Sequence, residues 1–133
     1  MNEYLVIIKL LISSLLSSLI GYEREVSEKP FGVRTAVLVG VAATLFTSMA
    51  KMSDLPYLLG SVVAGVGFIG GGVITKEKDR IRGLTTAAVI WVVTAIGMAI
   101  GLEYYLTAFT VTIISFTVLR FKKLESEFAK RIS

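Results

Sequence analysis

Residues 83–102 read GLTTAAVIWVVTAIGMAIGL, twenty residues without a charge between Arg82 and Glu103. A helix rises 1.5 Å per residue, so about 20 residues cross a hydrocarbon core of about 30 Å. A helix at the surface of a soluble protein needs a polar stripe toward water, and this segment has no charged residue to form one. It therefore predicts a helix that is surrounded by lipid.

The same pattern recurs along the 133 residues, which are 54% hydrophobic. Residues 35–50, 55–75 and 104–119 also carry no charge, and the first apolar stretch is interrupted only by Lys9. We therefore expect an all-α integral membrane protein, a single domain over residues 1–133 with five transmembrane helices in a compact bundle. The predicted spans are about 4–22, 35–50, 57–75, 84–101 and 104–119, followed by a basic amphipathic tail at 120–133.

The composition excludes several classes of protein. The chain has no Cys and no His, which removes disulfide frameworks, thiol nucleophiles and the commonest general base. No catalytic residues are predicted, so we expect no enzyme. The net charge of +4 comes without a recognition motif for nucleic acid, so we expect none to bind. The start, MNEY, lacks the basic segment of a secretory signal, which favours a retained first helix.

The basic residues indicate the orientation in the membrane. Twelve of the fourteen lie in residues 23–34, 76–82 and the segment after Leu119, which share one side if there are five spans. Positive residues accumulate on the cytoplasmic side of a membrane protein. We therefore expect the N-terminus outside and the C-terminus in the cytoplasm.

Small residues at spacings of three and four occur on every predicted helix, and such rows let membrane helices approach closely. The third helix has the most glycine. Close packing is the favoured interpretation; the alternative is a break at residues 70–72 that exposes carbonyls to an ion or ligand. The glycines assigned to this packing or break are Gly65, Gly67, Gly70, Gly71, Gly72, Gly97 and Gly101.

Charged residues gather at the predicted cytoplasmic rim, where two helices begin with similar sequences. Thr35, Thr85 and Thr86 lie at these helix starts, where a hydroxyl can accept a bond from a free N–H group. The row Ser14, Ser18, Gly21 leads to Glu25, so we expect Glu25 on the packed face, paired with an arginine. The candidate cluster is Glu23, Arg24, Glu25, Arg34 and Arg82.

Three roles remain open for this cluster. It could be a structural clamp with no ligand. It could bind an anion or headgroup at the two helix N-termini. It could also hold a divalent cation such as Mg²⁺ through oxygen ligands from Glu23, Glu25 and Glu28. No resident cofactor is expected.

Three further expectations concern single features. Lys51 and Asp54 should pair in a turn, and Trp91 should be a packing residue within its helix. The tail should lie along the membrane surface, in preference to a contact between subunits. Its apolar residues are Phe121, Leu124, Phe128 and Ile132.

Four blocks of the sequence, taken together, resemble the membrane domain of the MgtC/SapB family. They are GYERE at 21–25, GVRT at 32–35, GVGFIGGGVI at 65–74 and RGLTTAAVIW at 82–91. The resemblance covers roughly residues 10–119. Two departures are visible: Tyr57 and Ser61 stand where many members have Arg and Gln, and the chain stops 14 residues past Leu119. We therefore expect a short form with the membrane domain only.

The resemblance implies a multi-pass protein of the prokaryotic cytoplasmic (inner) membrane with no settled biochemical activity. It links the chain to magnesium homeostasis under magnesium limitation, stress adaptation and virulence, and names the F-type ATP synthase as a possible partner. We favour a non-enzymatic regulator or adaptor that acts through membrane-protein partners and forms a homo-oligomer. The alternative is an oligomeric transporter of Mg²⁺ or another ion or solute.

Overall fold

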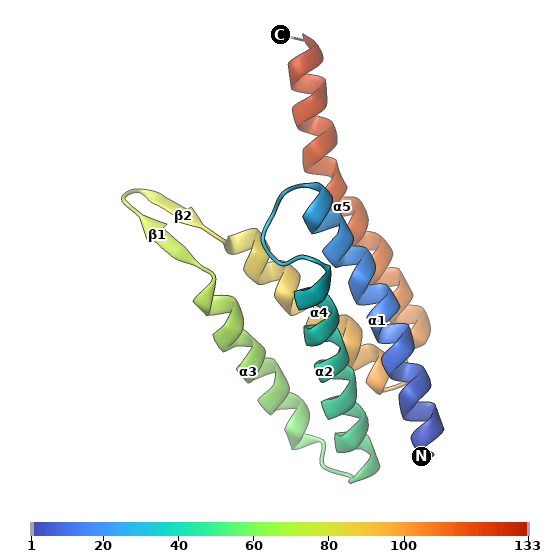
Figure 1. Ribbon diagram of the computed structural model, residues 1–133. Helices are drawn as coiled ribbons and strands as arrows, with labels where there is room; N and C mark the ends of the chain where they lie inside the picture. The colour runs from blue at the N-terminus through green and yellow to red at the C-terminus, as the bar shows by residue number, and fades with distance from the viewer. Residues whose placement is uncertain (1, 133) are drawn as a thin grey trace.

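The computed structural model describes residues 2–132 and contains five helices and one short β-hairpin (Figure 1). This confirms the predicted all-α membrane bundle. Four helices are long and apolar enough to cross a membrane, whereas the third has 16 residues. Five crossings and their orientation therefore stay predictions. The elements are α1 (Glu3–Val26), α2 (Val33–Met52), α3 (Tyr57–Gly72), β1 (Thr75–Glu77), β2 (Arg80–Arg82), α4 (Leu84–Gly101) and α5 (Tyr105–Ile132).

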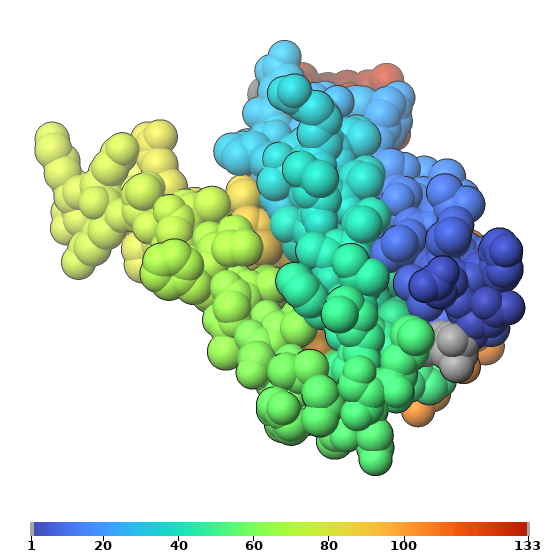
Figure 2. Space-filling view, turned by 60° about the horizontal axis from the view of Figure 1, so that its bottom comes forward, coloured from blue at the N-terminus to red at the C-terminus, as the bar shows by residue number. Residues whose placement is uncertain are grey.

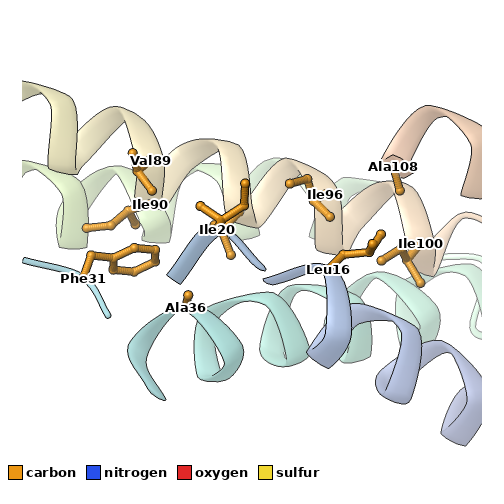
Figure 3. Packing of buried hydrophobic residues seen from close by; sticks show 10 residues of the cluster. Leu16, Ile20, Phe31, Ala36, Val89, Ile90, Ile96, Ile100 and Ala108 are labelled. Atoms are coloured by element: carbon orange, nitrogen blue, oxygen red, sulfur yellow. The ribbon is translucent and has the colours of Figure 1, made fainter. Parts of the chain in front are cut away.

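Helices α1, α2 and α4 form the centre of the bundle, while α3 and α5 lie on its outer sides (Figure 1). A group of buried apolar side chains joins α1 to α4 (Figure 3). Leu16 and Ile20 of α1 contribute to it, and Phe31 closes it at the end near the α1–α2 loop. The α4 members are Val89, Ile90, Val93, Ile96 and Ile100.

Helices α2 and α4 are in contact through their backbones. A Cβ atom added to Gly97 would lie 2.5 Å from the carbonyl oxygen of Gly40, and one added to Gly101 would lie 2.7 Å from Cβ of Thr47. Both distances are too short for a real side chain, so only glycine fits. On the other side of α2, Gly21 of α1 meets the Val33 backbone in the same way, at 2.6 Å. Small residues therefore set the distances between the three central helices.

The glycines of α3 behave differently. A Cβ atom added to Gly65, Gly67, Gly71 or Gly72 would meet nothing within 4 Å, and only Gly70 approaches another helix, 3.7 Å from Cβ of Ala87. Helix α3 is continuous to Gly72, so no break interrupts it before its end. Most of the glycine-rich surface of α3 is thus open rather than packed.

The connection between α3 and α4, which the predicted spans leave as a short charged segment, is a β-hairpin. Helix α3 ends three residues before the predicted boundary at 75, because Thr75, Lys76 and Glu77 pair with Arg82, Ile81 and Arg80 in antiparallel register. Gly83 then turns the chain into α4 with a φ of +86°. This left-handed conformation is readily available to glycine. Space-filling Figure 2 shows the hairpin projecting from one side of the molecule.

Helix α5 continues without interruption from the bundle to Ile132. Its last turns extend beyond the other helices in line with the first ones (Figure 1). No kink turns residues 120–132 away from the axis of α5, which argues against the predicted placement of the tail along the membrane surface; that placement stays a prediction.

The glycine contact predicts opposite effects of the same substitution at two positions. Gly97→Ala should destabilise the bundle by about 1–3 kcal/mol, because its methyl group overlaps the Gly40 carbonyl. Gly67→Ala should raise stability by about 0.5–1 kcal/mol, because the site is open and alanine favours helix. Thermal unfolding in detergent measures both; a Gly97→Ala protein as stable as Gly67→Ala would contradict the contact.

Candidate functional site

Arg24 is the centre of the charged cluster that the sequence predicts at the cytoplasmic rim. It lies in the last turn of α1, is only 4% exposed, and donates through Nη2 to Oγ1 of Thr86 at 2.7 Å. Its Nε donates to the carbonyl oxygen of Pro30 at 3.1 Å. One guanidinium thus connects α1, the α1–α2 loop and the first turn of α4. It places a buried positive charge at the start of α4.

Glu23 is the second buried charge of this rim, at 1% exposure. Its Oε1 accepts a hydrogen bond from Oγ of Ser27 at 2.7 Å, whereas Oε2 has no partner among the described residues. A buried carboxylate needs a compensating charge, and the adjacent guanidinium of Arg24 interacts with it electrostatically. The two residues form a buried pair of opposite charges without a direct salt bridge.

The predicted pairing of Glu25 with an arginine is wrong. Glu25 is exposed, and its Oε1 accepts from the backbone N–H of Val33 at 2.9 Å, at the first position of α2. The prediction followed the row Ser14–Ser18–Gly21, but the inward row is displaced by one residue. Ser13 and Ser17 are buried, whereas Ser14 and Ser18 bond to carbonyls of their own helix. Arg24 therefore takes the inward position expected for Glu25.

The remaining predicted rim residues do not join Arg24. Arg82 pairs with Glu77 across the hairpin at 3.4 Å, with both side chains about two-thirds exposed. Arg34 makes no ion pair with any described residue, and Thr35 and Thr85 are exposed. Gly32 and Gly83 are the N-cap residues of α2 and α4, so the predicted threonine caps are not formed. Of the three threonines, Thr86 alone reaches the cluster.

The arrangement gives little room for a metal ion at this rim. Within residues 2–132 no three acidic side chains come together in a way that could hold a metal. Glu23 points into the bundle, Glu25 caps α2 and Glu28 is exposed in the loop. The prediction that Glu23, Glu25 and Glu28 together form a magnesium site is therefore wrong, because the three carboxylates face different directions.

A second charged cluster lies at the opposite end of the bundle. Lys9, only 1% exposed, donates through Nζ to Oε1 of Glu103 at 3.0 Å and to the carbonyl oxygen of Gly101 at 3.1 Å. Lys51 of α2 binds Oε2 of the same carboxylate at 2.8 Å. The predicted Lys51–Asp54 pair is therefore replaced by Lys51–Glu103. One carboxylate in the α4–α5 turn connects α1 and α2.

The two ammonium groups strongly favour the ionised form of Glu103. Hydrogen bonds from Lys51 and Lys9, together with the charge of Lys9, lower the pKa of Glu103 to about 2. This cluster is not among the residues predicted from the sequence, although the sequence contains a signal for it. Lys9 is the one charge inside a predicted span, and Glu103 is the one charge between the last two predicted spans. Charges in such places need partners.

Between the two clusters, hydroxyl groups line the contact of α1 with α2 and α4. Oγ1 of Thr44 lies 2.8 Å from Oγ of Ser13 and 2.9 Å from the carbonyl oxygens of Gly40 and Gly97. Ser17, Thr47 and Ser48 are also fully buried, and their hydroxyls have no partner in the described part of the chain. The contact of α1 with α2 is thus polar and tightly packed.

A shallow apolar groove of about 300 Å³ runs between α3 and α4. Trp91, predicted to be a packing residue, is 59% exposed and lines this groove. The opposite wall is formed by α3 and includes its Gly67, Gly70 and Gly71. The lining residues are Val66, Gly67, Gly70, Gly71, Ile74, Ala87, Ala88 and Trp91.

The Arg24 cluster predicts a difference between two adjacent threonines. Thr86→Val keeps the shape but removes the acceptor of the buried guanidinium, which should cost about 1–3 kcal/mol of stability. Thr85→Val should change stability by less than about 0.5 kcal/mol, because Thr85 is exposed and forms no capping bond. Unfolding in detergent compares them; equal effects would exclude the Arg24–Thr86 bond as a stabilising contact.

The Glu103 cluster predicts acid sensitivity. The folded-state pKa of about 2 lies below the ordinary value of 4.5, so the stabilisation is complete above 4.5 and is lost as the pH falls through about 2. Glu103→Gln should lower the melting temperature at neutral pH, and it should make the melting temperature fall less steeply as the pH is lowered below 4.5. Asp54→Asn, which changes an exposed acid in another turn, is the control. If the melting temperature of the Glu103→Gln protein depended on acid pH as strongly as that of the unchanged protein, the stabilising role of Glu103 would be refuted.

Known proteins resemble the chain over nearly its whole length. The family model described as the MgtC family matches residues 10–127. Protein MgtC of Salmonella typhimurium is 39% identical over 130 residues, which cover 96% of this chain and 55% of that protein. Protein SapB of Bacillus subtilis is 37% identical over 117 residues, covering 78% of this chain and 50% of that protein. No solved structure matches the chain.

A protein of Escherichia coli named putative magnesium transporter YhiD is 40% identical over 111 residues, covering 74% of this chain and 52% of that protein. The chain thus spans about half the length of these curated relatives. The matched region contains the buried Arg24 and Glu23 as well as α2 to α4. The chain belongs to the MgtC family and is a multi-pass protein of the bacterial inner membrane.

Proposed function

We propose that this chain is a non-enzymatic regulator or adaptor in adaptation to magnesium limitation and stress, and that it acts by binding other membrane proteins. The magnesium link rests on its family and on the name of the Escherichia coli relative. The mode of action rests on one observation, the open glycine face of α3. By resemblance to its family, the F-type ATP synthase is a candidate partner.

The open face of α3 has the geometry of a helix-docking surface. Gly60, Gly67 and Gly71, with Ala64 between them, share one side of α3, and the glycines have nothing within 4 Å of an added Cβ. The same spacing in α4, Gly97 and Gly101, brings the α2 backbone into contact. Glycines weaken a helix. In a membrane this loss of stability is offset when another helix packs closely against the glycines. Within residues 2–132, no helix approaches this face of α3 so closely.

The groove beside this face offers a partner helix more contact. Trp91 and the α3 glycines line it, and it opens to the outside of the bundle. Figure 2 shows α3 at the edge of the molecule, with its outer surface uncovered. A helix in lipid placed there would contact α3 and α4 together. This supports binding within the membrane over binding by the short loops.

Transport of Mg²⁺ or another ion is the second candidate. The buried hydroxyls of Ser17, Thr47 and Ser48 and the free Oε2 of Glu23 favour it, because such groups can bind ions. Against it, the backbones of α2 and α4 touch at Gly40 and Gly97, which leaves no opening between them. A path would have to form between subunits of an oligomer, which is why the regulator is preferred.

The proposal predicts that filling the glycine face removes function without unfolding the chain. Gly71→Leu should weaken co-purification of membrane-protein partners, including the F-type ATP synthase, and impair growth of a complemented deletion strain at low magnesium. A Cβ atom at residue 71 meets nothing within 4 Å, and the rest of the side chain can point into the open groove, so the melting temperature should not fall. Gly65→Leu is the matched control, because Gly65 is equally open but faces another side of α3.

Two results would count against the regulator. Normal partner binding and growth with Gly71→Leu would show that the glycine face is not used. Flux of Mg²⁺ into proteoliposomes above that of empty vesicles, lost in Glu23→Gln, would support the transporter instead.

A further inference from the structure

Helix α5 carries a second unpartnered surface, on the side opposite its contacts with the bundle. Of the helices long enough to span a membrane, α5 is the least covered: 11% of its most apolar window is buried, against 50% in α4. Its inner side is formed by the buried Ala108 and Thr112. At 100° per residue, the opposite side contains residues 110, 114, 117, 121, 124 and 128.

These six positions follow alternating steps of four and three, the spacing of a coiled-coil seam. All six are exposed: Thr110, Ile114, Thr117, Phe121, Leu124 and Phe128. We define them as the α5 seam. In the apolar part of the helix, two of the three seam positions are threonine, whereas exposed residues beside the seam are large, as in Ile113 and Val118. In the tail the seam becomes large and apolar.

Each part of the seam suits helix association in its own surroundings. In lipid, small residues allow close approach, and the hydroxyls of Thr110 and Thr117 already donate to the carbonyls of Leu106 and Ile113. In water, burial of Phe121, Leu124 and Phe128 supplies the driving force. The change from small to large residues thus follows the change of solvent along one continuous helix.

The charges beside the seam identify the occupant. Arg120 and Glu125 flank the seam on its two sides, five residues apart. In a parallel, in-register pair of helices these are g and e′ positions, so Arg120 of each helix faces Glu125 of the other. Copies inserted in one membrane with one orientation present α5 in parallel and at equal height. We propose that the α5 seam binds the α5 seam of a second copy of this chain, forming a symmetric dimer that continues from the membrane into a short coiled coil.

The straight course of α5 argues against the alternative that its tail binds an anionic lipid surface. A surface-bound helix lies parallel to the membrane plane, whereas residues 120–132 continue along the axis of the spanning part (Figure 1). Basic residues of the tail such as Lys122 and Lys123 lie outside the seam. They remain in water when two tails pair.

Disulfide cross-linking in native membranes tests the dimer, because the chain has no cysteine of its own. Single substitutions Thr110→Cys, Thr117→Cys and Leu124→Cys, one heptad apart on the seam, should form covalent dimers on mild oxidation. Phe109→Cys and Ser126→Cys, exposed positions on other sides of α5, should not. Equal cross-linking on all sides, or none on the seam at normal protein levels, would overturn the proposal.

A charge exchange separates the specific pair from chance collision. In the Leu124→Cys background, Arg120→Glu should slow cross-linking by about two- to fivefold, the range of an exposed ion pair. The added Glu125→Arg should restore the rate. If the tail instead lay on lipid, Leu124→Cys would be shielded from a water-soluble thiol reagent in anionic vesicles and would form no dimer, which would refute the seam.

Discussion

The contact between the α2 and α4 backbones at Gly40 and Gly97 determines the positions of the other helices. Lipid tails are as apolar as leucine, so association of helices in a membrane depends on van der Waals contact and hydrogen bonds rather than on exclusion of water. Gly97 and Gly101 allow that contact, and Thr44 adds its hydroxyl between the carbonyls of Gly40 and Gly97. Because α2 and α4 lie so close, Ser13 of α1 reaches Thr44 and Arg24 of α1 reaches Thr86. Both charged clusters then sit at the ends of this three-helix unit.

Much of the fold could be predicted because lipid imposes a simple rule on the sequence. Charges are excluded from the spans, so the uncharged stretches locate the helices, and α4 occupies residues 84–101 as predicted. The hairpin of β1 and β2 could not be predicted, because residues 75–82 are mostly charged and all exposed, without a buried face to produce alternation. The end of α5 was hard to place for a related reason: its tail has an apolar stripe that suits either a lipid surface or another helix.

The candidate site was predicted in composition but not in arrangement. Arg24 and Glu23 were in the expected cluster, but the inward direction was assigned to Glu25, one residue too far along the helix. A helix turns 100° per residue, so an error of one residue changes which side chain is buried. The Lys9–Glu103–Lys51 cluster joins residues more than ninety positions apart, and only the packing of α1 against the α4–α5 turn brings them together. Pairing at such separations depends on tertiary structure, which spacing along one chain does not contain.

The same architecture keeps the two open surfaces apart. Helices α3 and α5 lie on different sides of the central unit (Figure 1), so an occupied α5 seam leaves the glycine face of α3 free. A dimer formed through α5 would present two α3 faces, one on each outer side, to other membrane proteins. Binding at both faces would raise the effective concentration of the second contact. A partner that is itself oligomeric in the membrane would then be held more tightly than a single-copy one, without any further contact from the loops.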